Sequence, residues 1–403
     1  MTDHNNNINV LHIGFSDSFK SGSSVSMIRI HNQLRAKNIK SKVMVVKKYS
    51  NNINISQFNF YNRVINFIKR SIMLILKKIE NVNNLNIHRS YNFFDNSYLL
   101  NIINNSKYNV IHFHWINGEM ISINDIVKIN KPIVWTLHDA WIINPSAHVV
   151  IINKKIKSIS NSLDKFFYKK KKYLLKKKFF SFITPSTELY KLCNKEIKNS
   201  KIYYIPHKVS RSFKRIKVNK KNKNFKTNKK NILFFSYPES DSFVKGNDLF
   251  KKILLQLSKE KDEYNIIICG NKNNLFKSSD NLKISYVGYL SEIKLNKLYN
   301  SVDLLVSCSR FESFSQTVFE AKKCNLPTIS FKVGGMIDAA NNKNIKLIKC
   351  YNYKEMSKEI TMFFHLKKKF KTKKKNFKKK KIVKSNYISI YNDILNNTYN
   401  NEK

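Results

Sequence analysis

Residues 306–320 are the stretch that most constrains what this chain can fold into. An apolar run is followed by a short polar loop and then by a helical pattern, which predicts a buried strand, a tight loop and the first turns of a helix. A helix N-terminus presents unpaired N–H groups and the positive end of a dipole, which suits a phosphate. Glu312 lies in the loop, and Glu320 lies further along the helix, where a carboxylate can accept hydrogen bonds from hydroxyls. The pattern therefore indicates a ligand that is part phosphate and part polyol, such as a nucleotide sugar.

The spacing of the two glutamates resembles the Glu-x7-Glu motif of the retaining glycosyltransferases of glycosyltransferase family 4. The continuation follows the same family pattern, in which a helix is stopped at Asn325-Leu326-Pro327, a strand follows, and a Gly334-Gly335 loop comes last. The resemblance spans roughly Asn9 to Asp338. It implies an α/β chain of the GT-B fold, with two Rossmann-like domains that face each other across a cleft.

The alternation of strands and helices supports two such domains. A strand at 9–15, a helix at 25–37 and a strand at 42–46 form a βαβ opening, which implies a parallel sheet. A second alternating set restarts at Asn231, after a lysine- and asparagine-rich stretch without periodicity. We predict an N-terminal acceptor-side domain at residues 1–207, a basic linker at 208–230 and a C-terminal nucleotide-sugar-binding domain at 231–384. The resemblance implies that a terminal helix at 385–403 crosses back to the first domain.

The resemblance also implies a set of site residues. The residues that match catalytic positions are His138 and Glu312, and those that match donor-binding positions are Gly22, Lys245, Gly246, Phe314, Ser315 and Glu320. No metal or other cofactor is expected, since the chain lacks an Asp-x-Asp pair and lysine with helix N–H groups would take the place of a metal.

Each of these residues has an implied role. Glu320 would hold the nucleotide ribose, and Glu312 would bind hydroxyls of the donor sugar. The Lys-Gly pair at 245–246 would neutralise the donor phosphates, while the N–H groups of Phe314 and Ser315 would approach the sugar and diphosphate. His138 ends a strand in Thr-Leu-His and would face the reaction centre, although a histidine there can also be structural.

Three positions depart from the family pattern. Phe235-Ser236-Tyr237-Pro238 occupies the place of a usual phosphate-clamping arginine, so Lys245 would act alone. Ser315 and Asn325 each replace a usual glycine. Asparagine tolerates a left-handed helix cap, whereas a serine at 315 would crowd the approach to the sugar.

The charge indicates an anionic partner. The formal net charge is +49, with only 26 acidic residues. A coding bias toward lysine, asparagine and isoleucine explains part of the excess, but it gives no reason to deplete the acids. An anionic membrane face, a pyrophosphate-linked lipid or nucleic acid would be attracted, and a solvated lysine-rich surface is the alternative.

Two regions could carry such an interaction. Residues 58–79 place apolar side chains on one face of a basic amphipathic helix, which either packs on the sheet or lies in a membrane interface. Lysines also gather at 165–178 and 367–381, with aromatic residues between them. The five cysteines show no metal-binding or CxxC spacing, which favours reduced thiols in a cytoplasmic protein. We expect no signal peptide and no membrane-spanning segment.

The segments His112–Asn117 and His138–Trp141 narrow the resemblance to enzymes of colanic acid, capsule and O-antigen assembly. The predicted function is a retaining, metal-independent transfer of a hexose-type sugar from a nucleotide-sugar donor to a polyprenyl-diphosphate-linked or other glycan. The predicted location is cytoplasmic, peripheral on the inner face of the plasma membrane, and nucleic acid is not expected as a partner. The alternatives are a catalytically weakened GT-B protein that binds polyanions through its basic surface and another GT-B enzyme, such as a sugar-nucleotide epimerase.

Overall fold

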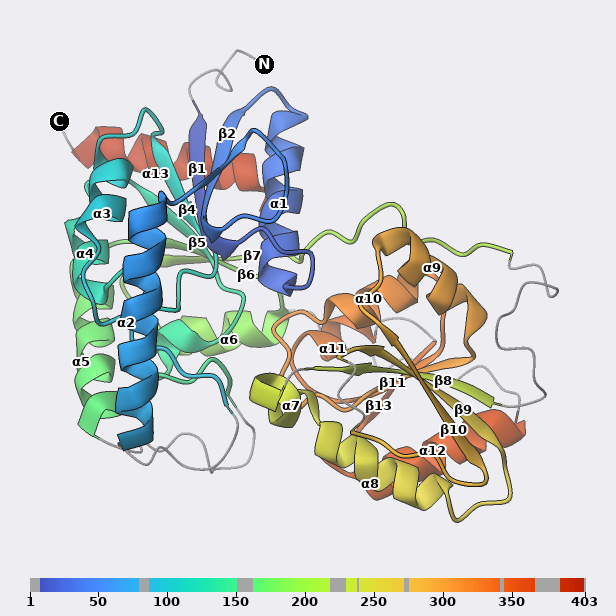
Figure 1. Cartoon of the computed structure of the whole chain (residues 1–403). Coiled ribbons are helices and arrows are strands. Elements are labelled where there is room, and N and C mark those ends of the chain that lie inside the picture. Colours follow the sequence, from blue (N-terminus) through green and yellow to red (C-terminus); the bar gives the residue numbers. More distant parts are fainter. Residues whose placement is uncertain are drawn as a thin grey trace.

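The chain forms two α/β lobes, each built on one parallel sheet (Figure 1). The computed structural model describes residues 8–79, 87–150, 162–217, 230–237, 239–271, 275–340, 344–366 and 385–401. Most of the predicted linker and the whole lysine run at 367–381 lie outside these residues. Within them, the strand order is β3-β2-β1-β4-β5-β6-β7 in the first sheet and β10-β9-β8-β11-β12-β13 in the second. The predicted α/β class with parallel sheets is confirmed.

Both sheets reverse their strand order beside their first strand, β1 and β8, and ligands bind at such switch points in open α/β sheets. The strands of the first sheet are β1 (Asn9–Ser16), β2 (Lys40–Lys47), β3 (Ile55–Gln57), β4 (Val110–Phe113), β5 (Ile133–Thr136), β6 (Ser181–Thr184) and β7 (Lys201–Tyr204). Those of the second are β8 (Lys230–Ser236), β9 (Tyr264–Gly270), β10 (Leu282–Gly288), β11 (Leu304–Ser307), β12 (Thr328–Phe331) and β13 (Ile345–Ile348).

Helices connect the strands and cover both sheets (Figure 1). In the first lobe they are α1 (Gly22–Arg35), α2 (Phe60–Ile79), α3 (Ser97–Asn104), α4 (Ile123–Lys128), the short 3-10 helix η2 (Trp141–Ile143), α5 (Ser162–Lys177) and α6 (Thr187–Glu196). In the second they are α7 (Glu239–Lys245), α8 (Asn247–Leu257), α9 (Glu292–Ser301), α10 (Gln316–Lys323), α11 (Gly335–Ala339) and α12 (Tyr353–Leu366).

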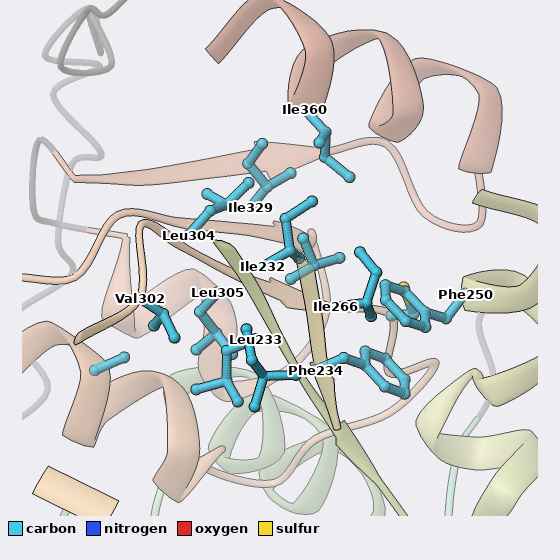
Figure 2. Close-up of a cluster of buried hydrophobic side chains, with 14 of the residues drawn as sticks. Ile232, Leu233, Phe234, Phe250, Ile266, Val302, Leu304, Leu305, Ile329 and Ile360 are labelled. Atoms are coloured by element: carbon cyan, nitrogen blue, oxygen red, sulfur yellow. The ribbon is translucent and has the colours of Figure 1, made fainter. Parts of the chain in front are cut away.

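The core of the second lobe shows why its strands read as nearly continuous apolar runs. Strands of a parallel sheet are covered on both faces, so successive side chains are all buried. Ile232 and Leu233 on β8 point to opposite faces of the sheet, and Ile232 points to the face that α12 covers with Ile360 (Figure 2). Every residue of β9 is buried in the same way.

The last helix, α13 (Tyr387–Asn401), packs on the first lobe although the preceding elements belong to the second (Figure 1). Ile390 and Tyr391 are fully buried in a cluster with Val10 and Val110 of the first sheet. The hydroxyl of Tyr391 also lies 2.8 Å from Nδ1 of His112 on β4. The chain end therefore ties the two lobes together.

Most apolar side chains of α2 are exposed to solvent, although Met73 and Leu76 pack in the core of the first lobe. Its exposed apolar residues are Phe60, Tyr61, Val64, Phe67, Ile68, Ile72, Leu74 and Ile75. The buried side instead holds Met73 and Asn66, whose side chain donates to the carbonyls of Gly118 and Glu119. Among the described residues, no helix has both the length and the apolar content to cross a bilayer.

Candidate active site

A cavity of about 680 Å³ lies between the two lobes, at the carboxyl ends of both sheets. The first lobe contributes the start of α1 and the ends of β4 and β5, and the second contributes the ends of β8 and β9 and the loop before α10. Of the predicted site residues, Gly22, His138, Lys245, Glu312, Phe314, Ser315 and Glu320 line this cavity. Gly246 does not line the cavity and instead packs against the backbone of Cys308.

Three glycines hold the loop before α10 by close backbone contact. A Cβ at Gly246 would lie 2.0 Å from the carbonyl oxygen of Cys308, and a Cβ at Gly334 would lie 1.6 Å from that of Glu312. Gly335 would similarly meet the carbonyl of Phe314 at 2.2 Å. Gly246 and Gly334 also have φ angles of +75° and +43°, which favour glycine. The requirement for glycine at 246, 334 and 335 is thus explained by close packing against this loop.

Lys245 forms an ion pair with Glu312 at the centre of the cavity wall. Its Nζ lies 2.7 Å from Oε1 of Glu312, which also accepts from Ser309 at 2.9 Å. Between the apolar run at 231–235 and the helical pattern at 249–257 the sequence predicts a loop that contains Lys245, but Lys245 is the last residue of α7. Arg310 fixes the turn between α7 and α8, because its guanidinium donates two hydrogen bonds of 2.7 Å to the carboxylate of Asp248 at the start of α8.

The N-terminus of α10 begins in a strained conformation. Ser315, its N-cap, has a φ of +69°, a left-handed value that serine adopts at a cost, and this geometry explains why a glycine is usual there. Its hydroxyl is buried and has no hydrogen-bond partner within the described residues. Asn325 also adopts a positive φ, +58°, just after this helix, as asparagine tolerates.

Glu320 is a buried carboxylate in the same cavity, with 5% of its surface exposed. Burial raises its pKa to about 7, against the opposing effects of Arg29 and of the Tyr299 hydroxyl. That hydroxyl donates to Oε2 at 3.1 Å, and the Arg29 guanidinium lies 3.7 Å from Oε1. A carboxylate that is poorly solvated and incompletely neutralised in this way is suited to accept bonds from ligand hydroxyls.

Arg29 reaches Glu320 from the first lobe, and the sequence reasoning did not identify it. It also donates to Glu292 at 2.7 Å. Gln316, at the start of α10, donates to the carbonyl of Gly22 and to Ser26 at 3.1 and 2.9 Å. Positions 22, 26 and 29 share one helical face, so a helix starting at Gly22 would have indicated Arg29. We had predicted its start at Val25.

His138 lies at the junction of the lobes. The Ser313 hydroxyl donates to the His138 carbonyl at 2.6 Å, across the cleft. Burial lowers the pKa of its imidazole to about 4, so the ring is neutral at pH 7. His207 stacks on it with ring centres 5.1 Å apart, and His207 in turn contacts Phe314. The apolar run at 202–205 predicts a strand that leads to His207, but it indicates no role for the His207 ring.

Behind His138, three buried imidazoles from β1 and β4 form the one group in the described residues with metal-ligand spacing: His12, His112 and His114. All of their ring nitrogens except Nε2 of His12 already bond to another imidazole or to a hydroxyl. His112 bonds to Tyr391 and Thr136, both at 2.8 Å. Nε2 of His114 lies 3.0 Å from Nδ1 of His12, and its Nδ1 lies 3.1 Å from Nε2 of His138.

A second cavity, of about 420 Å³, adjoins the first on the side of the first lobe. Trp115 and Asp139 line both. The Asp139 carboxylate accepts from the Trp115 indole at 3.1 Å and lies 2.5 Å from Nδ1 of His148. Although burial pushes the pKa of Asp139 upward, His148 and other partners bring it below its usual value. The cavity thus combines aromatic rings with an ionised carboxylate.

Comparison with known proteins identifies the second half of the chain. Residues 217–381 match the family described as Glycosyl transferases group 1. No curated protein matches the chain in sequence. The family match covers less than half of the chain, and with the solved structures below it confirms the predicted enzyme class, a glycosyltransferase.

Solved structures match nearly the whole chain in fold. Sucrose-phosphate synthase from Thermosynechococcus elongatus is 12% identical, with a TM-score of 0.62 over 89% of this chain and 90% of that one. HepE of Anabaena, in complex with UDP-glucose, is 14% identical, with a TM-score of 0.60 over 90% and 91%. WaaG, a glycosyltransferase involved in lipopolysaccharide biosynthesis, is 13% identical, with a TM-score of 0.57 over 87% and 90%. The predicted GT-B fold is confirmed.

The glycine contacts predict the effect of an added methyl group. Gly246→Ala should destabilise the protein by at least about 2 kcal/mol, since its Cβ meets a backbone carbonyl at a positive φ. Gly22→Ala is the matched control, because a Cβ there meets nothing within 4 Å. Thermal unfolding of both variants checks this, and equal melting temperatures would contradict it.

The raised pKa of Glu320 predicts a pH-dependent stability. Its folded-state pKa of about 7 exceeds the unfolded value near 4.5, so stability is lost as pH rises from about 4.5 to above 7. Glu320→Gln removes this loss, by up to about 3 kcal/mol. The variant should therefore gain more in melting temperature over wild type at pH 8 than at pH 5. Asp280→Asn, at an exposed carboxylate, is the control, and an equal gain at both pH values would argue against a buried, raised carboxyl.

Proposed function

We propose that this chain is a retaining glycosyltransferase of family 4 that transfers a hexose-type sugar from a nucleotide-sugar donor to a lipid-linked glycan. One observation carries the proposal. Lys245, the N-terminus of α10 and two carboxylates, Glu312 and Glu320, line the wall of one interlobe cavity. A diphosphate that joins a sugar to a ribose is complementary to this set of charges.

Each group has a task in donor binding. The Lys245 ammonium and the N–H groups at the start of α10 would neutralise the diphosphate, with the unpartnered Ser315 hydroxyl beside them. Glu320 would accept bonds from the ribose. Oε1 of Glu312 is taken by Lys245 and Ser309, which leaves Oε2 for hydroxyls of the donor sugar. Support for such a donor comes from HepE, which has the same fold and binds UDP-glucose.

The reaction needs little beyond positioning and charge stabilisation. The acceptor hydroxyl attacks the anomeric carbon on the face that the leaving group departs from. The bond from this carbon to the phosphate oxygen breaks, and that oxygen takes the acceptor proton. The products are a glycoside of retained configuration and a nucleoside diphosphate. Lys245 and the α10 dipole would stabilise the developing negative charge, a task that needs no metal ion.

The second cavity is the place proposed for the acceptor. It opens beside His138, and its Trp115, His88 and His148 rings offer apolar faces of the kind against which sugars pack. The Asp139 carboxylate can accept from acceptor hydroxyls. WaaG, another structure of this fold, acts in lipopolysaccharide biosynthesis, which supports a role in cell-surface polysaccharide synthesis.

The proposed location is the inner face of the plasma membrane, with α2 as the contact. Eight apolar side chains of α2 are exposed, among them Phe67 at 67% and Ile68 at 50%. Phe93, 43% exposed, follows beside α2, and Lys170 of α5 lies 6.0 Å from its ring. An apolar helix face bordered by lysines on a chain of charge +49 is complementary to an anionic bilayer surface.

Nucleotide binding tests the donor site. UDP, GDP, ADP and CMP, each in EDTA, should be compared for their effect on melting temperature. One nucleotide family should stabilise the wild type, by about 2.7 kcal/mol at a hundred times its Kd, and should not stabilise Glu320→Ala. Asp280→Ala, at an exposed carboxylate outside the cavity, should respond as wild type does.

Two results would count against this proposal. If no nucleotide stabilises the protein, the donor site is absent and the polyanion-binding alternative gains support. If stabilisation, or sugar transfer to a glycan acceptor, disappears in EDTA, the metal-independent mechanism is wrong.

Vesicle binding tests the membrane contact. The protein should sediment with vesicles that contain phosphatidylglycerol and not with pure phosphatidylcholine. The double variant Ile68→Glu/Ile72→Glu should lose most of this binding, because it places charge on the exposed face of α2. Ile53→Glu is the matched control, since Ile53 is 90% exposed but lies outside α2. Undiminished binding by the double variant would exclude α2 as the contact.

A further inference from the structure

A row of three hydrogen-bonded imidazoles runs from the interior of the first sheet to the cavity. Nδ1 of His12 lies 3.0 Å from Nε2 of His114, and Nδ1 of His114 lies 3.1 Å from Nε2 of His138. The three rings come from the neighbouring strands β1 and β4 and from the end of β5. His138 lines the cavity, and its Nδ1 has no hydrogen-bond partner among the described residues, so this nitrogen is left for a ligand.

The row couples the proton position on each ring to that on the next. Burial lowers the pKa of His12 and His114 well below the usual value, so both rings are neutral and carry one proton each. Each hydrogen bond between two rings needs one proton. If His114 carries its proton on Nδ1, then His138 must carry its own on Nδ1, facing the ligand. If His114 carries it on Nε2, then His138 presents a bare Nδ1.

The far end of the row decides between the two arrangements. In the second arrangement His12 would carry its proton on Nε2, a buried nitrogen that has no partner within the described residues. A buried N–H group without an acceptor is rare in proteins. In the first arrangement His12 donates through Nδ1 to His114, and its Nε2 is an unprotonated nitrogen. The first arrangement leaves no donor without a partner along the row.

We propose that His12 and His114 are positioning residues that fix the tautomer of His138, so that its Nδ1–H donates into the cavity. This inference rests on the proposed function, under which the hydrogen bond from His138 is accepted by an oxygen of the donor sugar or of its phosphate. His112 braces the row, since its ring stacks on His114 with centres 4.3 Å apart and is itself held by Thr136 and Tyr391.

A metal ion bound by His12, His112 and His114 is the competing use of these rings. Such an ion would replace the proton shared by His12 and His114 and would break the bonds of His112 to Thr136 or Tyr391. Three neutral imidazoles can hold Zn²⁺ in proteins. Here five of the six ring nitrogens already have hydrogen-bond partners, so ligation would exchange these bonds for the metal.

The tautomers can be observed directly by nitrogen-15 NMR on protein labelled at histidine. In the ligand-free wild type, His138 should be protonated on Nδ1 and unprotonated on Nε2. Its signal is assigned by its loss in His138→Gln. Protonation of His138 on Nε2 would overturn the proposal, and so would a stoichiometric divalent metal retained by the purified protein and bound to these rings.

Two variants of His114 separate positioning from packing. Asparagine places its amide nitrogen close to the former Nδ1 and can still donate to His138, whereas glutamine places it close to the former Nε2, toward His12. His114→Asn should therefore keep the His138 tautomer, and His114→Gln should lose it. The glutamine variant should turn over at least about tenfold more slowly than the asparagine variant, with an unchanged Kd for the nucleoside diphosphate, which lacks the sugar.

The outcomes distinguish this inference from the proposed function. Retention of the Nδ1–H tautomer in His114→Gln, or equal turnover by the two variants, would overturn the positioning role. If no nucleotide binds to the wild type but the tautomers behave as expected, the row stands as a device that fixes His138 and the proposed function fails. Melting temperatures of both variants check that each is folded.

Discussion

The close packing of glycine backbone against the loop at 308–315 is the constraint on which the rest of the site depends. Gly246 and Gly334 have no side chain at the points where they meet the carbonyls of Cys308 and Glu312. Those two contacts come from opposite sides of the loop, one from the α7–α8 turn and one from the start of α11. The loop is thereby fixed between two elements of the second lobe. Glu312 lies on the loop and Lys245 lies beside it, and their side chains form an ion pair at 2.7 Å.

Much of the fold could be predicted from the sequence because its strands are short, apolar and separated by clear breaks. β1 ends one residue beyond the strand predicted at 9–15, and β8 begins one residue before the predicted restart at Asn231. Shorter elements were missed where local signals are weak. α3 and α4 are capped by the side chains of Asn96 and Ser122, and these contacts depend on tertiary neighbours as much as on local sequence.

The site was predicted unevenly, and the division follows the chain. Glu312 and Glu320 belong to one contiguous motif, and Lys245 lies in a separate Lys-Gly pair of the same domain; all three line one cavity. The contacts that Arg29 and Gln316 make across the cleft, and the row of histidines, depend on which residues of different strands or different lobes become neighbours. The spacing within one helix can mark Arg29 as lying on the same face as Gly22, but it does not give the partner on the opposite lobe. The amphipathic helix α2 was predicted, but only burial could decide that most of its apolar side chains are turned to solvent.

Arg29 gives the closed cleft a property of its own. It bridges the lobes by pairing with Glu292 at 2.7 Å and approaching Glu320 at 3.7 Å. These carboxylates therefore already have a cationic partner when no ligand is bound, and the partner belongs to the opposite lobe. A polyol that bonds to Glu320 must share or displace this arginine, so its entry exchanges one interlobe bond for a ligand bond. Ligand binding and opening of the cleft are then coupled, because the ligand and Arg29 compete for the carboxylate oxygens of Glu320.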